Sequence, residues 1–285
     1  MSTASPVDPE SAGLRRAREA AMVRVLSTLL PGAGRDEPDG VTAAARTIGP
    51  AVAALELLAD GALDVAWDGL VHRRCRIRPA RRDSLDDLGS GAGDAARPVL
   101  RSLRAAERAG WWTARAEVEV DDVLVVHELA RRRSEGSAQA PAPETVAEHA
   151  AGAAVESGAR DQATPARPLR AAAASSSALA GRSVDMVRVT PAAVAAWGGA
   201  TGDRNAVHLR PGAALEAGLS VGRDEVVAHG LLLGAISLAV TPARDGVVDL
   251  RLLAPCAVPE CGCEIAVDEV SGTVLAGGRT LLRRG

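Results

Sequence analysis

The sequence predicts an α+β fold made of two similar parts, each with an antiparallel sheet wrapped around one buried helix. Three observations lead to this expectation. A tract rich in Ala, Pro, Ser and Gly at 134–182 reads as a largely disordered linker between the two parts. Each part contains one apolar segment of helix length. Each part also contains segments in which apolar and polar residues alternate, as they do along a half-buried strand. Because helices and sheets must each bury an apolar face, the two kinds of element are expected to pack together.

The first part, residues 1–133, is expected to begin with helices and to continue with strands. Apolar residues recur at helical spacing before they alternate, and Pro50 marks the point where the second helix would break. The expected elements are helices at 14–30 and 41–60, strands within 63–80 and 110–132, and a loop at 86–98.

The second part, residues 183–285, is expected to contain one strongly apolar helix followed by strands. Thr190 suits the N-cap of an earlier helix and Pro191 suits its first position. The segment "HGLLLGAISLAV" is apolar on nearly all faces, which indicates a buried helix. The expected elements are a strand at 186–189, helices at 190–202, 212–219 and 229–240, and three strands at 246–258, 263–272 and 273–284.

Composition excludes several classes of protein. A formal net charge of -3 gives no bulk attraction to nucleic acid or to an anionic membrane. The first residues lack a signal-peptide core, and no apolar run reaches the roughly eighteen residues of a spanning helix. We therefore expect a cytoplasmic, soluble protein. The cysteine cluster "CAVPECGC" at 256–263 has no histidine nearby, so free thiols are expected and no metal site.

A carboxylate and an imidazole share one turn in "TGDRNAVH" (201–208). Asp203 and His208 on such a turn can hold one water between them, as general acid–base catalysis requires. Gly230 begins the buried helix, where free N–H groups favour a developing negative oxygen. This set suits addition or removal of water next to a thioester carbonyl. Taken alone, the Gly-Asp-x-Asn pattern also fits a plain turn.

Asn205, in the middle of this turn, is the only asparagine of the chain. All 33 basic residues are arginine, and Tyr and Phe are absent, so the sequence avoids residues with AT-rich codons. A rare residue that persists against this bias is informative. An amide carries a donor and an acceptor on two separate atoms, a combination that neither Asp nor Ser offers at this position.

The segment from 187 to 240, with its Asp-x-Asn-x-x-His element and its later His-Gly, resembles the MaoC-like dehydratases, which are R-specific enoyl-thioester hydratases of hotdog fold. The strands at 250–270 extend the resemblance, which covers 185–284. The whole layout is similar to double-hotdog 3-hydroxyacyl-thioester dehydratases, with "GLVHRRCRIRPARR" as the matching stretch of the first part. Ala206 stands where the family has proline, and Trp197 stands where it has Tyr or Phe.

The resemblance implies a double hotdog whose second half is catalytic. Asp203 and His208 would be the catalytic pair, Asn205 would orient the pair or its water, the Gly230 N–H would bind the thioester oxygen, and His229 would support the turn. The implied reaction is reversible hydration of trans-2-enoyl thioesters, or dehydration of (R)-3-hydroxyacyl thioesters, in fatty-acid or polyketide-type metabolism. It needs no cofactor, because coenzyme A or phosphopantetheine arrives with the substrate.

A basic strip at 72–82 contains Arg73, Arg74 and Arg76. One interpretation is a strand edge that charge protects from further pairing. The other is a dock for the phosphates of coenzyme A or for an acidic acyl carrier protein, because guanidinium groups bind phosphate in a bidentate manner. Acyl-CoA or acyl carrier protein is the expected partner, and a homodimer is left open.

The acyl chain is expected to lie between the two parts, beside 51–60, where Ala53 and Ala54 leave room. The first part lacks the motif and is expected to supply no acid–base group. Two alternatives are kept. One is a non-catalytic hotdog that binds acyl thioesters or serves as a partner subunit. The other is a hotdog thioesterase, which is disfavoured because such enzymes place a carboxylate on the central helix and 229–240 has none.

Overall fold

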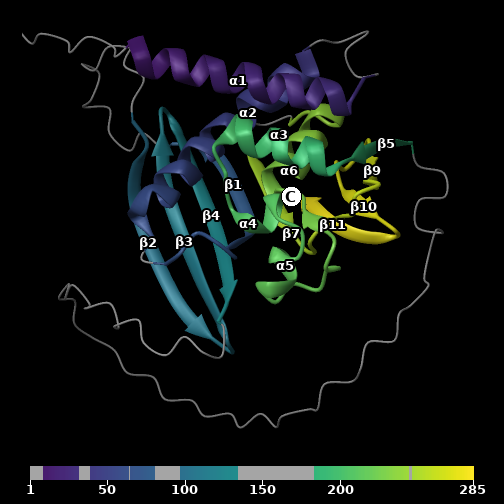
Figure 1. Ribbon diagram of the computed structural model, residues 1–285. Helices are drawn as coiled ribbons and strands as arrows, with labels where there is room; N and C mark the ends of the chain where they lie inside the picture. The colour runs from purple at the N-terminus through teal and green to yellow at the C-terminus, as the bar shows by residue number, and fades with distance from the viewer. Residues whose placement is uncertain (1–8, 32–38, 64, 81–96, 134–182, 244–245) are drawn as a thin grey trace, which may run out of the picture.

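The computed structural model describes residues 9–31, 39–63, 65–80, 97–133, 183–243 and 246–285 (Figure 1). The linker predicted at 134–182 and most of the loop predicted at 86–98 lie outside these ranges. The described residues form one nine-stranded antiparallel sheet, a small two-stranded sheet and the helices that pack on them. The predicted α+β class is therefore confirmed.

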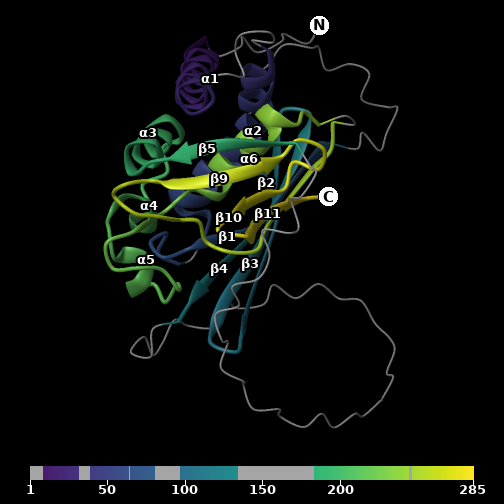
Figure 2. The ribbon, with the colours of Figure 1, turned by 90° about the vertical axis from the view of Figure 1, so that its right-hand side faces the viewer.

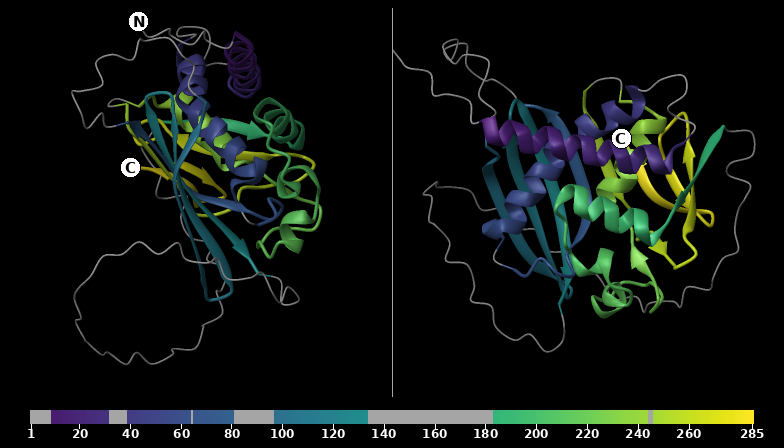
Figure 3. Two further views of the ribbon diagram at one scale, coloured as in Figure 1. Left: turned by 90° about the vertical axis from the view of Figure 1, so that its left-hand side faces the viewer. Right: turned by 45° about the horizontal axis from the view of Figure 1, so that its top comes forward.

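The first part supplies two long helices and four strands. Helix α1 crosses over both parts and contacts α2 and α3 (Figure 3). The π-helical turn η1 extends α2. The elements are α1 (Pro9–Leu29), α2 (Asp39–Leu57), η1 (Leu58–Ala62), β1 (Val71–Pro79), β2 (Val99–Arg108), β3 (Trp111–Val120) and β4 (Val123–Arg132).

The second part supplies the buried helix α6, three further helices and the remaining strands. Thr190 caps α3 by accepting a hydrogen bond from the Ala193 N–H, and Pro191 is its first residue, as predicted. The elements are β5 (Val184–Val189), α3 (Pro191–Thr201), α4 (Ala206–Leu209), α5 (Ala213–Glu216), β6 (Val226–Val227), α6 (Gly230–Val240), β7 (Val248–Leu252), β8 (Ala257–Val258), β9 (Cys263–Asp268), β10 (Val274–Ala276) and β11 (Arg279–Arg284).

The large sheet runs continuously through both parts, in the order β2-β3-β4-β1-β7-β11-β10-β9-β5. The junction is the antiparallel pair of β1 and β7, from Arg74 opposite Arg251 to Ile77 opposite Val248. The first part thus contributes four strands of the sheet and the central helix α2, and the second part contributes five strands and the central helix α6. These two helices pack against each other at the centre (Figure 2). This arrangement matches the double-hotdog layout that the sequence resemblance implied.

The core is dense around the two central helices. Ile48 and Ala51 of α2 are fully buried, and Leu232 and Ile236 of α6 are too.

The segment Gly40–Ala62 is long and apolar enough to span a membrane by length and composition alone. Packing against α6 and the sheet accounts for its apolar character. The same packing explains why α2 continues through Pro50 instead of breaking there: tertiary contacts on both sides outweigh the lost backbone hydrogen bond.

The strands differ from the predictions in several places. Within 63–80 the strand begins only at Val71, after a turn. Each of 246–258 and 273–284 forms two strands instead of one. Strand β2 was not predicted, because its residues are exposed on both faces and show no alternation. A tight hairpin through Ala109 and Gly110, both at positive φ, holds β2 against β3.

The interpretation of the basic strip as a strand edge is wrong. Strand β1 pairs with β4 on one side and with β7 on the other, so it is an interior strand. Its arginines instead join the two parts. Arg74 binds both carboxylate oxygens of Asp249 at 2.7 and 2.6 Å, and Arg76 binds the same carboxylate at 3.2 Å.

We expect Asp249→Asn to lower the free energy of unfolding by about 1–3 kcal/mol at neutral pH, since it removes the charged acceptor of a bidentate bond. The hydrogen bonds from Arg74 lower the pKa of the Asp249 carboxyl in the folded protein. The carboxylate therefore stabilises the fold above its unfolded pKa of about 3.9, and this contribution is lost as the pH falls through the lower folded value. Denaturant unfolding at several pH values measures the difference. The exposed Asp185→Asn is the matched control, and an Asp249→Asn variant as stable as that control would contradict the expectation.

Candidate active site

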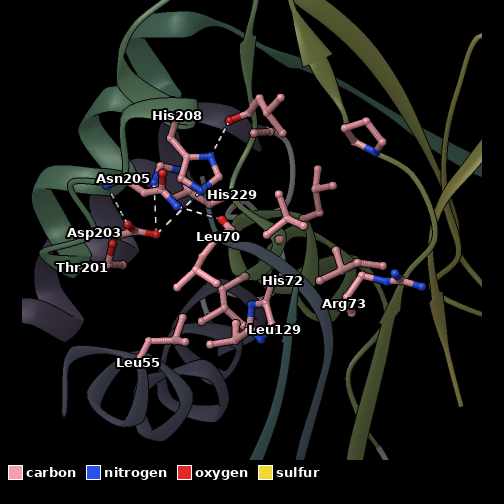
Figure 4. A pocket seen from close by; sticks show the side chains of 18 of the residues that line it. Leu55, Leu70, His72, Arg73, Leu129, Thr201, Asp203, Asn205, His208 and His229 are labelled. Atoms are coloured by element: carbon pink, nitrogen blue, oxygen red, sulfur yellow. Dashed lines mark hydrogen bonds and ion pairs between the residues drawn. The ribbon is translucent and has the colours of Figure 1, made fainter. Parts of the chain in front are cut away.

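A cavity of about 380 Å³ lies between the two parts and contains the predicted acid–base residues. Helix α2 and strand β1 form its wall in the first part, and the Asp203–His208 turn and the start of α6 form its wall in the second (Figure 4). Leu55, Leu70 and Leu129 make the wall of the first part largely apolar. The polar groups of the turn thus face an apolar space.

Asp203 follows the end of α3, where Gly202 adopts a positive φ of 75° that reverses the chain. Its Oδ1 accepts two hydrogen bonds, from the backbone N–H of Asn205 at 3.0 Å and from the indole Nε1–H of Trp67 at 3.1 Å. Its Oδ2 faces the imidazoles of His208 and His229. One oxygen is therefore held by protein donors while the other is directed toward the reactive groups.

His208 lies on the short helix α4, with its Nδ1 2.7 Å from the carbonyl oxygen of Val227. A carbonyl can only accept, so Nδ1 carries the proton and the neutral ring has its lone pair at Nε2. This Nε2 is 3.8 Å from Asp203 Oδ2. Desolvation by burial lowers the pKa of His208, although the nearby Asp203 opposes the shift. The ring is accordingly neutral at pH 7.

His229 lies directly before α6 and is 3% exposed. Its ring stacks on His208 with centroids 3.8 Å apart, and its Nε2 is 3.7 Å from Asp203 Oδ2. Neither ring nitrogen has a hydrogen-bond partner among the described residues. Burial, together with the neighbouring His208, lowers its pKa well below the ordinary value. The sequence resemblance gave His229 a supporting role, and the structure places it in contact range of the acid–base pair.

The gap between Asp203 and His208 fits a donor that bridges them. At 3.8 Å the two atoms are too far apart for a direct hydrogen bond, and both are acceptors when the carboxyl is ionised and the ring is neutral. A water or hydroxyl group in the gap would donate to one of them or to both.

Atoms of Asp203, His208 and His229 that could bind a metal ion lie within 4.8 Å of one another. The two imidazole rings are 26° from parallel, and Nε2 of each lies within 3.8 Å of Asp203 Oδ2.

Asn205 is placed differently from the prediction that it orients the pair or its water. Its side-chain Oδ1 accepts from the backbone N–H of Gly69 at 3.1 Å and of Val207 at 3.3 Å, and its Nδ2 donates to the carbonyl of Leu70 at 2.8 Å. The amide does use both its donor and its acceptor, as expected. Its partners are backbone groups, two of which belong to the first part, while only the Asn205 backbone N–H touches Asp203.

Gly230 begins α6 and lines the cavity. N–H groups in the first turn of a helix lack intrahelical acceptors, so they are suited to bind an anionic oxygen. A Cβ on Gly230 would lie 2.6 Å from Cδ1 of Leu252 and 3.3 Å from Cβ of His72. Glycine therefore allows the close packing of α6 on β1 and β7 beside the cavity.

The three arginines suggested for substrate binding separate into two groups. Arg73 is exposed and lines the cavity, with its guanidinium group directed away from the turn that carries Asp203 and His208 (Figure 4). Arg74 and Arg76 bind Asp249 at the junction of the two parts and do not line the cavity. Their side chains are thus engaged in holding the sheet together, and Arg73 alone of the three is positioned for a ligand.

The first part contributes more to the site than expected. His72 lines the cavity, and its Nε2 is 2.7 Å from Nδ1 of the buried His127. Burial lowers the pKa of His127 to about 4, and its Nε2 lies 3.1 Å from the carbonyl of Ala51. The first part was expected to supply no acid–base group, and it nevertheless brings the imidazole of His72 to the cavity wall. Alternation in the sequence showed that both histidines lie on strands, but not that the strands bring them together.

The residues of α2 that face the cavity are Val52, Leu55 and Glu56. Part of 51–60, the segment expected beside the acyl chain, therefore lines the cavity. Ala53 and Ala54, which were expected to leave room for an acyl chain, do not line it, because they lie on other faces of the helix. Ala54 is fully buried in the core.

The four cysteines are free thiols. Cys256 is buried and lines the cavity, and Cys263 lies partly buried nearby in the same apolar core. A hydrogen bond from the Cys256 thiol lowers the pKa of Cys263 to about 7.

No family model and no curated protein matches the sequence. Among solved structures, HtdX of Mycobacterium tuberculosis is similar at 18% identity and a TM-score of 0.47, over 87% of this chain and 94% of that one. A MaoC-like dehydratase is similar at 16% identity and a TM-score of 0.48, over 95% and 92%. The acyl-CoA thioesterase II TesB2 of Mycobacterium marinum reaches 13% and 0.31, over 84% and 87%.

Proposed function

We propose that the protein catalyses reversible hydration of trans-2-enoyl thioesters, the reverse reaction being dehydration of (R)-3-hydroxyacyl thioesters. The observation that carries the proposal is the 3.8 Å gap between Asp203 Oδ2 and His208 Nε2 in an apolar cavity. Both atoms accept hydrogen bonds, so a water molecule between them can donate to Asp203 and to His208. This is the position proposed for the water that is added. The apolar remainder of the cavity suits the acyl chain.

In the hydration direction, His208 Nε2 takes a proton from the bound water while the oxygen of that water bonds to C3 of the enoyl group. The electron pair of the double bond moves toward the thioester oxygen, which the N–H of Gly230 stabilises. The proton held by the catalytic pair then passes to C2. The net change is addition of H and OH across the double bond. Asp203 stabilises the imidazolium that forms in between.

The thioester carrier is proposed to be coenzyme A or phosphopantetheine, and the chain requires no cofactor of its own. Arg73, which is exposed and lines the cavity, is proposed to bind a phosphate of the carrier. Acyl-CoA or acyl carrier protein is thus the proposed partner, in fatty-acid or polyketide-type metabolism in the cytoplasm.

The test is an assay with crotonyl-CoA that follows the loss of the enoyl absorbance. The expected result is hydration that depends on enzyme concentration and yields only the (R)-3-hydroxy product. Binding of crotonyl-CoA without turnover would instead favour an acyl-thioester-binding partner subunit. Release of free thiol would favour a thioesterase, which the absence of any carboxylate from α6 disfavours.

Leu55→Trp is expected to shorten the acyl chain that the protein accepts. Leu55 points into the cavity from α2, so an indole there fills space that a long chain would occupy (Figure 4). The ratio of activity on a long to a short enoyl thioester should fall roughly 10-fold or more, in line with lost pocket contacts. Ala53→Trp, on the same helix but outside the cavity lining, is the control. An unchanged ratio for Leu55→Trp would place the acyl chain elsewhere.

A further inference from the structure

A tight turn of the first part lies against the catalytic turn of the second. It spans Trp67–Leu70, with the Leu70 N–H donating to the Trp67 carbonyl at 3.2 Å and Gly69 at a φ of 81°. This geometry is that of a type II turn, whose third position favours glycine. The turn is an irregular segment just before β1, and the burial of Leu70 anchors it in the core.

Every residue of this turn binds the catalytic turn. The side-chain amide of Asn205 forms two hydrogen bonds with the backbone of Gly69 and Leu70, in the way that one peptide group pairs with another. Two further hydrogen bonds lie on either side of this pair. The four are Trp67 Nε1–H to Asp203 Oδ1 at 3.1 Å, Gly69 N–H to Asn205 Oδ1 at 3.1 Å, Asn205 Nδ2–H to Leu70 O at 2.8 Å, and Ala206 N–H to Asp68 Oδ1 at 3.1 Å.

We propose that Trp67 is a positioning residue that fixes the carboxylate of Asp203 for catalysis, so that the active site is complete only when the two parts are docked. The inference rests on the proposed function and extends it. Oδ1 is held by Trp67 on one side and by the Asn205 backbone on the other. With Oδ1 fixed, rotation of the carboxylate is restricted and Oδ2 stays directed at His208 and His229.

The chemistry of indole suits this task. Its N–H donates and never accepts, so it favours the ionised carboxylate and does not itself titrate. Trp67 also packs against the core, so its ring is held in place by contacts independent of the hydrogen bond. The chain has only four tryptophans and neither Tyr nor Phe, and one of these few aromatic residues is placed against the catalytic carboxylate.

The first test is Trp67→Phe in the full chain, which keeps a flat ring but removes the donor. For hydration of crotonyl-CoA, kcat should fall roughly 10- to 100-fold, as is typical when a residue that orients a reactive group is lost, with KM nearly unchanged. A fall confined to kcat identifies a group that acts on the reacting atoms, because a merely structural loss would not leave KM unchanged. Trp112→Phe, half-buried outside the cavity, should behave as wild type. A Trp67→Phe variant with wild-type kcat would overturn the proposal.

The second test does not depend on turnover. In ¹⁵N-labelled protein each tryptophan gives one indole N–H signal, and the signal missing from Trp67→Phe identifies that of Trp67. The chemical shift of this signal should change in Asp203→Ala, which removes the carboxylate that accepts the hydrogen bond, while the signal of Trp112 stays in place. A Trp67 signal at the same position in both proteins would also overturn the proposal. If the signal behaves as expected while wild type hydrates no enoyl thioester, then the positioning contact stands and the proposed reaction fails.

Discussion

Asp203→Asn should abolish hydration of an enoyl thioester while leaving the protein folded. The amide oxygen of asparagine can take the place of Oδ1 and keep both hydrogen bonds, from Trp67 and from the Asn205 backbone. Its NH₂ group would then face Nε2 of His208 as a donor, where the wild type presents an acceptor. The bridging water loses one acceptor and the imidazolium loses its counter-charge. General acid–base catalysis contributes about 100- to 10,000-fold, and a loss of this size is expected in kcat/KM.

His208→Ala is expected to cause a loss of the same order, and the double variant should be little worse than either single one. Both groups act on one water, so their contributions are not additive. Steady-state kinetics on the three variants gives the comparison, and thermal unfolding confirms that each is folded. If folded Asp203→Asn kept nearly wild-type activity, the assignment of the acid–base pair would be wrong.

The sequence was sufficient to predict the elements whose patterns are local. Helix α6 was predicted because it is apolar on all faces, and α3 because Thr190 and Pro191 form a recognisable start. Asp203 and His208 were predicted to meet because they share one turn. In each case the residues that determine the feature lie within a few positions of one another.

The contacts that complete the site could not be predicted in this way. Trp67 and Asp203 are 136 residues apart, and no periodicity indicates that an indole will meet a carboxylate over that distance. The same holds for Asn205, whose rarity signalled importance without identifying its partners. Arg74 and Arg76 looked like a charged edge because their partner, Asp249, lies on a strand of the other part. Sequence patterns report burial and local geometry, whereas the pairing of the two parts is a property of the assembled fold.

Separating the two parts should therefore eliminate activity altogether. A chain of residues 183–285 expressed alone would lose the pairing of β7 with β1 and the packing of α6 on α2. It would also lose Trp67 and the backbone partners of the Asn205 amide, leaving buried polar groups without hydrogen bonds. An exposed strand edge beside an uncovered apolar helix promotes association. The fragment is expected to aggregate or to dimerise with itself, with hydration below detection.

Supplying residues 1–133 in trans should restore part of this activity, because all the lost contacts are non-covalent. Size-exclusion chromatography and the crotonyl-CoA assay on the fragment, on the mixture and on the intact chain measure both effects. The sharper control is a full-length protein cut within 134–182 after folding, which keeps both parts docked and should remain active, since no described contact requires the chain to be continuous there. An active, monomeric 183–285 fragment would contradict the expectation, because it would show that the acid–base pair is held in place without Trp67 and that the first part only covers the cavity. Loss of activity in the cut protein would instead show that covalent continuity, and not docking, maintains the geometry around Asp203.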